Sequence, residues 1–273
     1  MPTGECAARQ VRSVGNANTP RPMKRILILG GTADARKLAG KLATSHDVTL
    51  SLAGRTENPV AQGVPVRTGG FGGAQGLAAY LAENRIDLMV DATHPYAAQI
   101  SANAAEAAQR TGTPAMALRR PAWEQQPGDR WTPVGSAAEA VAALGDRPRK
   151  IFLALGRQEL LPFEAAPQHS YVIRSVDPVE PPLGVPHATY ILARGPFSEA
   201  GDRALLETHG IDAIVSKNSG GQATYGKIAA ARALGIEVFL ISRPHLPDMA
   251  GGAGVDEVLR LADHVLGARN RGV

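Results

Sequence analysis

The sequence predicts an α/β protein with two doubly wound parallel sheets, Rossmann-like or flavodoxin-like, and a cleft between them. From Arg25 onward, short apolar runs alternate with alanine-rich stretches of helical length, which is the pattern of parallel strands with helices on both faces. The alternation stops at 119–135, a segment that contains proline, glycine and both tryptophans, and then it resumes. This order predicts two units of similar size.

The first unit opens with the apolar run at 25–29. Two glycines end this run, and Thr32 is placed to cap the helix after it. Pro95 suits the first turn of a later helix. The predicted strands are 25–29, 47–53, 64–67, 87–91 and 115–118, and the predicted helices are 33–44, 74–83 and 96–110.

The second unit repeats this order. Its predicted helices are 136–144, 198–208, 222–234 and 254–266, and its predicted strands are 150–155, 170–175, 189–194, 212–217 and 237–242. We therefore expect an N-terminal domain over 23–133 and a C-terminal α/β domain over 134–268 that completes the cleft. Residues 1–22 have no apolar period and precede Met23, so we expect a disordered extension there.

The composition excludes several classes of function. The net charge is +4, but the sequence has no basic run with interleaved aromatic residues, so we expect a polyanionic small molecule as partner and no nucleic acid. The single cysteine, Cys6, rules out a disulfide framework and a cysteine-based zinc cluster, and we expect no metal site. A signal-peptide core and an apolar run of about 18 residues are both absent from the sequence, which predicts a cytoplasmic protein without a membrane partner.

The opening strand leads into a candidate dinucleotide site that lacks the usual G-x-G-x-x-G. Gly30, Gly31 and Thr32 stand between strand and helix, where backbone N–H groups and the positive helix end can hold a phosphate. An ordinary strand-to-helix turn is the alternative. Arg55 and Thr56 follow the second strand, where an NAD-binding domain usually has an acidic residue. A guanidinium there favours the 2′-phosphate of NADPH, unless Arg55 is only a surface arginine.

Loops in both units bring further polar groups to the cleft. Thr93, His94 and Tyr96 follow the fourth strand, and His94 can give a proton or a hydrogen bond to a substrate, or only cap its helix. In the second unit Arg194 can meet a carboxylate or form a surface salt bridge.

The loop at 214–227 carries the strongest local signal in the sequence. Ser216, Lys217 and Ser219 supply a cation and hydrogen-bonding groups, and Gly220 frees the backbone to form an anion nest. A polar turn with a helix cap is the alternative.

Taken together, these motifs resemble the precorrin-6A reductases, NADPH-dependent enzymes of cobalamin biosynthesis. The matching stretches lie in order along residues 25–244 and include ILILGGTADARKLA, DATHPYAAQISANA, ARGPFSEA and VSKNSGGQATYGKIAAAR. One departure is Asp34, where the family often has Glu. The resemblance implies hydride transfer from NADPH to the C18–C19 double bond of precorrin-6A, giving precorrin-6B. The partner would be a polyanionic tetrapyrrole, with neighbouring pathway enzymes as candidate protein partners.

Carried over by position, the resemblance implies a role for each residue. We expect the cofactor to contact Gly30, Gly31, Thr32, Arg55, Thr56, Thr93, Ser216, Lys217, Ser219 and Gly220; the substrate to contact His94, Tyr96, Arg194 and Ser219; and catalysis to use His94, Tyr96 and Lys217. The proton can come from His94, Tyr96 or solvent. Three other functions stay open: a cobalt-precorrin-6A reductase of the anaerobic route, a non-catalytic NADPH-binding protein, and a methyltransferase that uses S-adenosyl methionine.

Overall fold

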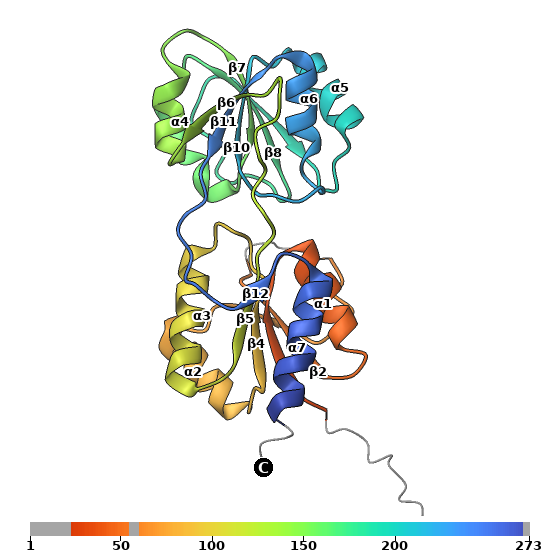
Figure 1. Ribbon diagram of the computed structural model, residues 1–273. Helices are drawn as coiled ribbons and strands as arrows, with labels where there is room; N and C mark the ends of the chain where they lie inside the picture. The colour runs from red at the N-terminus through yellow and green to blue at the C-terminus, as the bar shows by residue number, and fades with distance from the viewer. Residues whose placement is uncertain (1–22, 55–59, 270–273) are drawn as a thin grey trace, which may run out of the picture.

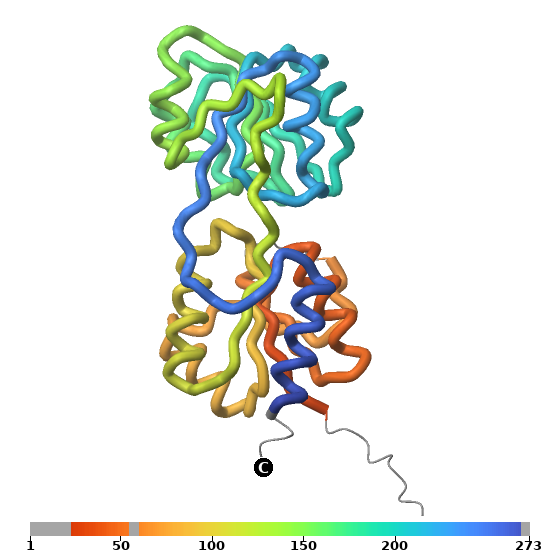
Figure 2. Tube along the Cα trace, viewed as in Figure 1, coloured from red at the N-terminus to blue at the C-terminus, as the bar shows by residue number. Residues whose placement is uncertain are grey.

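The computed structural model describes residues 23–54 and 60–269, which form two lobes joined by two connecting segments, 119–129 and 242–250 (Figures 1 and 2). Each lobe contains a six-stranded sheet in which every pair of neighbouring strands is parallel. The predicted fold class, two doubly wound parallel sheets, is confirmed. Within the described residues, no helix has the length and apolar character needed to cross a membrane.

The first sheet has the strand order β12-β5-β4-β1-β2-β3. Its strands are β1 (Arg25–Leu29), β2 (Asp47–Leu52), β3 (Val66–Thr68), β4 (Leu88–Asp91), β5 (Ala115–Leu118) and β12 (Gly251–Gly252). Helices α1 (Ala33–Leu42) and α7 (Val255–Arg269) cover one face, and α2 (Gly73–Glu83) and α3 (Ala98–Thr111) cover the other (Figure 1).

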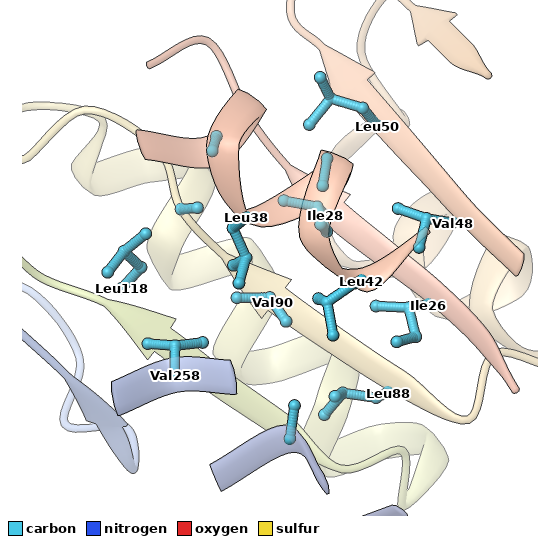
Figure 3. Packing of buried hydrophobic residues seen from close by; sticks show 14 of the residues in the cluster. Ile26, Ile28, Leu38, Leu42, Val48, Leu50, Leu88, Val90, Leu118 and Val258 are labelled. Atoms are coloured by element: carbon cyan, nitrogen blue, oxygen red, sulfur yellow. The ribbon is translucent and has the colours of Figure 1, made fainter. Parts of the chain in front are cut away.

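Strand β1 lies in the middle of this sheet, and its sequence explains why both faces are covered. Ile26 and Ile28 point to the side of α1 and α7, whereas Leu27 and Leu29 point to the side of α2 and α3. All four side chains are buried. Figure 3 shows the first of these layers, where Ile26 and Ile28 lie among apolar side chains of α1, β2, β4 and α7. A strand that is apolar at successive positions is stable only with helices on both sides.

The second sheet has the strand order β6-β11-β10-β7-β8-β9. Its strands are β6 (Arg130–Val134), β7 (Lys150–Ala154), β8 (Ser170–Ser175), β9 (Ala188–Leu192), β10 (Ala213–Lys217) and β11 (Glu237–Ile241). Helix α4 (Ala137–Leu144) and the 3₁₀ helix η2 (Leu161–Ala165) pack on one face, and α5 (Glu199–His209) and α6 (Gly226–Leu234) pack on the other.

Each sheet is completed by a strand from the other half of the chain. Strand β6 comes after β5 in the sequence but forms the edge of the second sheet, next to β11. Strand β12 comes after β11 but forms the edge of the first sheet, next to β5. Helix α7 returns with β12, and its Val258, Ala262 and Leu266 are buried against the first sheet.

This exchange corrects the predicted boundary between 23–133 and 134–268 at two points. The strand β6 at 130–134 was not predicted, and it belongs to the second domain. The helix predicted at 254–266 is found, but it belongs to the first domain. An amphipathic helix fits any apolar sheet face, so its sequence pattern could not decide between the two sheets.

The pairing of β12 with β5 depends on a glycine. A Cβ atom on Gly251 would come within 2.0 Å of the Ala117 carbonyl oxygen. The Ala117 N–H donates to the Ala250 carbonyl, and the Arg119 N–H donates to the Gly252 carbonyl, both at 2.9 Å. Backbones this close leave no room for a side chain, so the two-residue strand requires glycine.

The remaining predicted elements are found within a few residues of their predicted positions. The largest shift is at the helix predicted from 222, which begins at Gly226. Residues 157–165 form two short 3₁₀ helices, η1 (Arg157–Glu159) and η2, that were not predicted.

Candidate active site

Loops after the carboxyl ends of strands in both sheets line one cleft, which has two pockets of about 400 and 610 Å³. Gly54, His94, Ala97 and Val176 line both pockets, so the pockets are continuous. Ligands of open parallel sheets bind beyond the carboxyl ends of the strands, and here two such ends meet. The predicted cleft between the domains is therefore confirmed.

The first pocket is built around the glycine loop between β1 and α1. Gly30, Gly31 and Thr32 line it, and Gly31 has a φ of +110°, which glycine adopts without strain. The Thr32 hydroxyl accepts a hydrogen bond from the Ala35 N–H at 3.0 Å and donates one to the Ala92 carbonyl at 3.0 Å. Thr32 therefore caps α1, as predicted, and ties the glycine loop to the end of β4.

Two arginines reach the first pocket from opposite domains. Arg36 comes from α1, and Arg194 comes from the loop after β9. The structure thus places Arg194 in the same pocket as the glycine loop, whereas we expected it to bind substrate. Arg55 and Thr56 lie outside the described residues.

A buried ion pair holds the loop after β4. Asp91 is fully buried, and its Oδ2 lies 2.5 Å from a guanidinium nitrogen of Arg119. The N–H and the hydroxyl of Thr93, which lines the first pocket, donate to Asp91 Oδ1 at 3.1 and 2.6 Å. Burial raises the pKa of Asp91, but the hydrogen bonds and charge of Arg119, with hydrogen bonds from Thr93 and Ser101, outweigh it and hold the pKa below its ordinary value. The carboxylate therefore stays ionised and fixes Thr93 at the cleft.

His94 lies where the two pockets meet. Its Nδ1 accepts a long hydrogen bond of 3.4 Å from the Tyr96 N–H, from which we infer that the neutral ring carries its proton on Nε2. Burial and the nearby charges of Arg120, Lys217, Arg243 and Lys227 lower the pKa of His94 to about 3. The ring is then neutral at physiological pH. It can donate one hydrogen bond, but it is poorly suited to give up a proton as an acid.

The hydroxyl of Tyr96 is engaged with the opposite domain. It donates to the Ile241 carbonyl and accepts a hydrogen bond from the Asn218 N–H at 2.7 Å. Burial raises the pKa of Tyr96 to about 12. Its ring lines the second pocket, but its hydroxyl serves as a link between the domains. The expectation that Tyr96 donates a proton to substrate is therefore not favoured.

The second pocket is the more basic of the two. Four cationic side chains line it, those of Arg157, Arg174, Lys217 and Lys227, together with Glu159 and Asp177. The Lys217 ammonium pairs with the Glu159 carboxylate and lies 5.0 Å from the centroid of the Tyr96 ring. Lys217 is thus at the cleft, as predicted, and Glu159 holds it there.

The loop after β10 reaches the cleft at only some of its predicted positions. Ser219 lines the second pocket. Ser216 is buried at the end of β10 and lines neither pocket. Gly220 packs against the first connecting segment, because a Cβ atom there would come within 2.1 Å of the Pro121 carbonyl oxygen. The predicted anion nest at Gly220 is thus a packing position.

Lys227 is one of several cleft residues that were not candidates from the sequence; Arg36, Arg157, Glu159 and Arg174 are others. The side chain of Lys227 is buried, its ammonium donates to the Thr224 carbonyl at 2.7 Å, and it lies 4.8 Å from the centroid of the Trp123 ring. Burial, together with the charge of Arg174, lowers the pKa of Lys227 to about 7, although Asp202 opposes the shift. Lys227 stands in the first turn of α6. Nothing in the sequence around it indicates that this lysine is buried.

Among residues 23–54 and 60–269, no group of three or more His, Cys, Asp and Glu side chains is arranged to hold a metal ion.

Comparison with known proteins agrees with the resemblance found in the sequence. Residues 25–263 match the family described as Precorrin-6x reductase CbiJ/CobK. The chain is 60% identical over 244 residues to the precorrin-6A reductase of Sinorhizobium sp, covering 89% of this chain and 94% of the relative. It is 30% identical over 236 residues to the cobalt-precorrin-6A reductase of Priestia megaterium, covering 81% and 91%. A solved structure, CobK precorrin-6A reductase, superposes with a TM-score of 0.85 at 49% identity, covering 89% of this chain and 97% of that one. The chain therefore belongs to the precorrin-6x reductase family, a family of oxidoreductases.

Proposed function

We propose that this protein reduces precorrin-6A with NADPH, adding hydride at C19 of the C18–C19 double bond to give precorrin-6B in cobalamin biosynthesis. The observation that carries the proposal is the pair of adjoining pockets. One contains a glycine loop at a helix N-terminus, the other is lined by four cations, and they meet at His94. A dinucleotide suits the first pocket, and a polycarboxylate suits the second.

The residues present fit a phosphorylated dinucleotide in the first pocket. The glycine loop and the N-terminus of α1 offer backbone N–H groups, and Arg36 and Arg194 offer positive charge from the two domains. We assign the 2′-phosphate to Arg55 on the sequence argument, because an arginine follows β2 where NAD-binding domains have an acid. Bound NADPH supplies the hydride.

The second pocket fits a macrocycle with carboxylates on its rim. Lys217 is paired with Glu159, and Arg174 is paired with Asp202 at 2.5 Å. These internal carboxylates reduce the repulsion among the four cations before a substrate enters. Substrate carboxylates can then form charge-assisted hydrogen bonds with the same side chains.

Catalysis follows from holding the two reactants together in a cleft that both domains line. The Tyr96 hydroxyl joins the domains at the second pocket, and the neutral His94 can orient a reactant through Nε2–H. Hydride addition at C19 also requires a proton at C18. Among the groups that line the second pocket, Lys227 suits this step, because an ammonium that titrates near neutral pH can donate a proton there.

A deuterium-transfer experiment tests the proposal. With NADPH deuterated at the transferred C4 position, one deuterium should appear at C19 of the product, and the hydrogen at C18 should come from solvent. A reduced product without deuterium would refute hydride transfer from NADPH. Arg55→Ala should weaken NADPH binding by about 1.5–3 kcal/mol, the scale of a hydrogen bond to a charged group, and leave NADH binding nearly unchanged. Equal weakening of both cofactors would show that Arg55 does not bind the 2′-phosphate.

Of the alternatives, family membership removes the methyltransferase. A cobalt-containing substrate is disfavoured by the higher identity to the precorrin-6A reductase, 60% against 30% for the cobalt-precorrin-6A reductase. Turnover with metal-free and cobalt-containing substrate measured side by side decides between the two. A non-catalytic NADPH-binding protein would bind the cofactor and reduce neither substrate.

A further inference from the structure

Arg120, in the first connecting segment, contacts helix α1 of the first domain and the Ser219 loop of the second. Its Nη1 lies 3.0 Å from Asp34 Oδ2, and its Nε donates to the Ser219 carbonyl at 2.7 Å. Asp34 stands in the first turn of α1, next to the glycine loop, and Ser219 lines the second pocket. One guanidinium therefore joins the cofactor helix of the first domain to the substrate loop of the second.

Asp34 creates an electrostatic conflict at the cofactor helix. A carboxylate in the first turn stabilises a helix, because it faces the positive end of the helix dipole. The same carboxylate repels a phosphate that binds at that helix end. Asp34 lines a small cavity with Thr32, Thr93 and Arg120, so the arginine neutralises the acid within one turn of the glycine loop.

The backbone of Arg120 is held independently of its side chain. Arg243, in the second connecting segment, donates from Nη1 to the Arg120 carbonyl at 2.8 Å and from Nε to the Asn218 carbonyl at 2.8 Å. Truncating the Arg120 side chain therefore leaves the two connecting segments joined to each other.

We propose that Arg120 is a positioning residue of the reaction, which neutralises Asp34 beside the cofactor phosphates and fixes the Ser219 loop relative to the glycine loop. The proposal rests on the proposed function, since it requires the cofactor in the first pocket. It predicts two separable effects, one on cofactor affinity through charge and one on hydride transfer through geometry.

The charge effect is tested with Arg120→Ala, Asp34→Asn and the double variant, by NADPH titration. Arg120→Ala should raise the Kd about fivefold to twentyfold, as expected for a carboxylate one-third exposed and left uncompensated near an anion. Asp34→Asn alone should bind as well as the wild type or better. The double variant should recover the wild-type Kd to within about twofold, a pattern that general damage to the fold does not produce.

The geometric effect is tested with Arg120→Lys, which keeps the charge but has a single nitrogen in place of the planar fork. Its NADPH Kd should stay near the wild-type value. Its single-turnover hydride transfer at saturating NADPH and precorrin-6A should be about tenfold slower, because one ammonium is poorly placed to hold Asp34 and Ser219 together. The KM for precorrin-6A should change less than kcat.

Arg149→Ala is the matched control. The side chains of Arg149 and Glu237 are 21% and 29% exposed, close to the 20% and 34% of Arg120 and Asp34. The Arg149–Glu237 pair lies at the amino ends of the strands, away from the cleft. This variant should lower the Tm without changing the NADPH Kd or the transfer rate. The proposal fails if Arg120→Ala binds NADPH like the wild type, if the double variant binds no better than Arg120→Ala, or if Arg120→Lys transfers hydride at the wild-type rate. A wild-type protein that does not bind NADPH would instead refute the proposed function.

Discussion

Replacing Lys227 by methionine should make the second domain more stable at neutral pH, although it removes a group proposed to act in catalysis. The ammonium is buried, and its pKa falls from 10.5 to about 7 on folding. Between these two pH values the unfolded chain binds a proton that the folded chain does not. The stability of the wild type therefore rises as the pH increases from 7 to 10.5 and is flat below 7 with respect to this group.

The size of the effect follows from the same shift. The fall of the Lys227 pKa from 10.5 to about 7 costs the wild type about 4 kcal/mol of stability at pH 7 and about 1–2 kcal/mol at pH 9.5. Methionine fills a similar volume but loses the hydrogen bond to Thr224 and the contact with Trp123, together worth about 1–2 kcal/mol. We therefore expect the free energy of unfolding of Lys227→Met to exceed that of the wild type by about 2–3 kcal/mol at pH 7. This difference should be smaller by roughly 3 kcal/mol at pH 9.5.

Urea unfolding followed by tryptophan fluorescence measures this gain in the correct domain. The sequence has two tryptophans, Trp123 and Trp131, and both pack in the apolar cluster beneath α5 and α6. Midpoints and slopes for wild type and Lys227→Met would be compared at pH 7.0 and 9.5. Lys150→Met, at an exposed lysine that begins β7 of the same domain, is the control and should leave the midpoints at both pH values close to those of the wild type.

A stability difference that is the same at both pH values would refute the assignment of a lowered pKa to Lys227, because packing alone does not titrate. Loss of hydride transfer in the stabilised variant would in turn indicate that the cost of burying Lys227 is retained for function.

Three further predictions concern the elements around the cleft. Gly251→Ala should destabilise the first domain by about 1–3 kcal/mol, since its Cβ meets the Ala117 carbonyl. Gly254→Ala is the control, because a Cβ there meets nothing within 4 Å, and it should not destabilise the domain. Equal urea midpoints for the two variants, followed by circular dichroism, would contradict this prediction. Asp91→Asn should cost about 3–5 kcal/mol by leaving the Arg119 guanidinium without its carboxylate partner, and a Tm within 2 °C of the wild type would argue against that role. His94→Gln should leave the shape of the pH profile of kcat/KM unchanged between pH 5 and 8, because His94 is already neutral there. If the variant instead lost a change in kcat/KM that the wild type shows near pH 6.5, His94 would titrate during catalysis.

The local features of this fold could be predicted from the sequence because they depend on local patterns. The apolar run at 25–29, the glycines after it and the cap at Thr32 all specify a strand, a turn and a helix within a dozen residues. The expected family and the cleft followed from motifs that stand at strand ends.

Features that depend on contacts between distant segments were beyond prediction. From the sequence, the Tyr96 hydroxyl is a candidate proton donor. In the structure it is hydrogen-bonded to Ile241 and Asn218, which lie more than a hundred residues away in the sequence. The burial of Lys227 and the Asp34–Arg120 pair are of the same kind, since each results from packing between elements that the sequence does not relate. The placement of α7 was missed for that reason as well.

The exchange of edge strands also determines the order in which the two domains can be completed during synthesis on the ribosome. Strands β1 to β5 are complete once residue 118 has been made, but β12 and α7, which finish that sheet and cover its face, end at residue 269. At translation rates of roughly 5–20 residues per second, the apolar surface around Ile26 and Val48 waits about 8–30 s for its cover. The second domain, by contrast, has all of its strands once β11 emerges. The half of the protein that is synthesised first is therefore the half that finishes folding last, and a nascent chain stalled before residue 250 would expose that surface to chaperones.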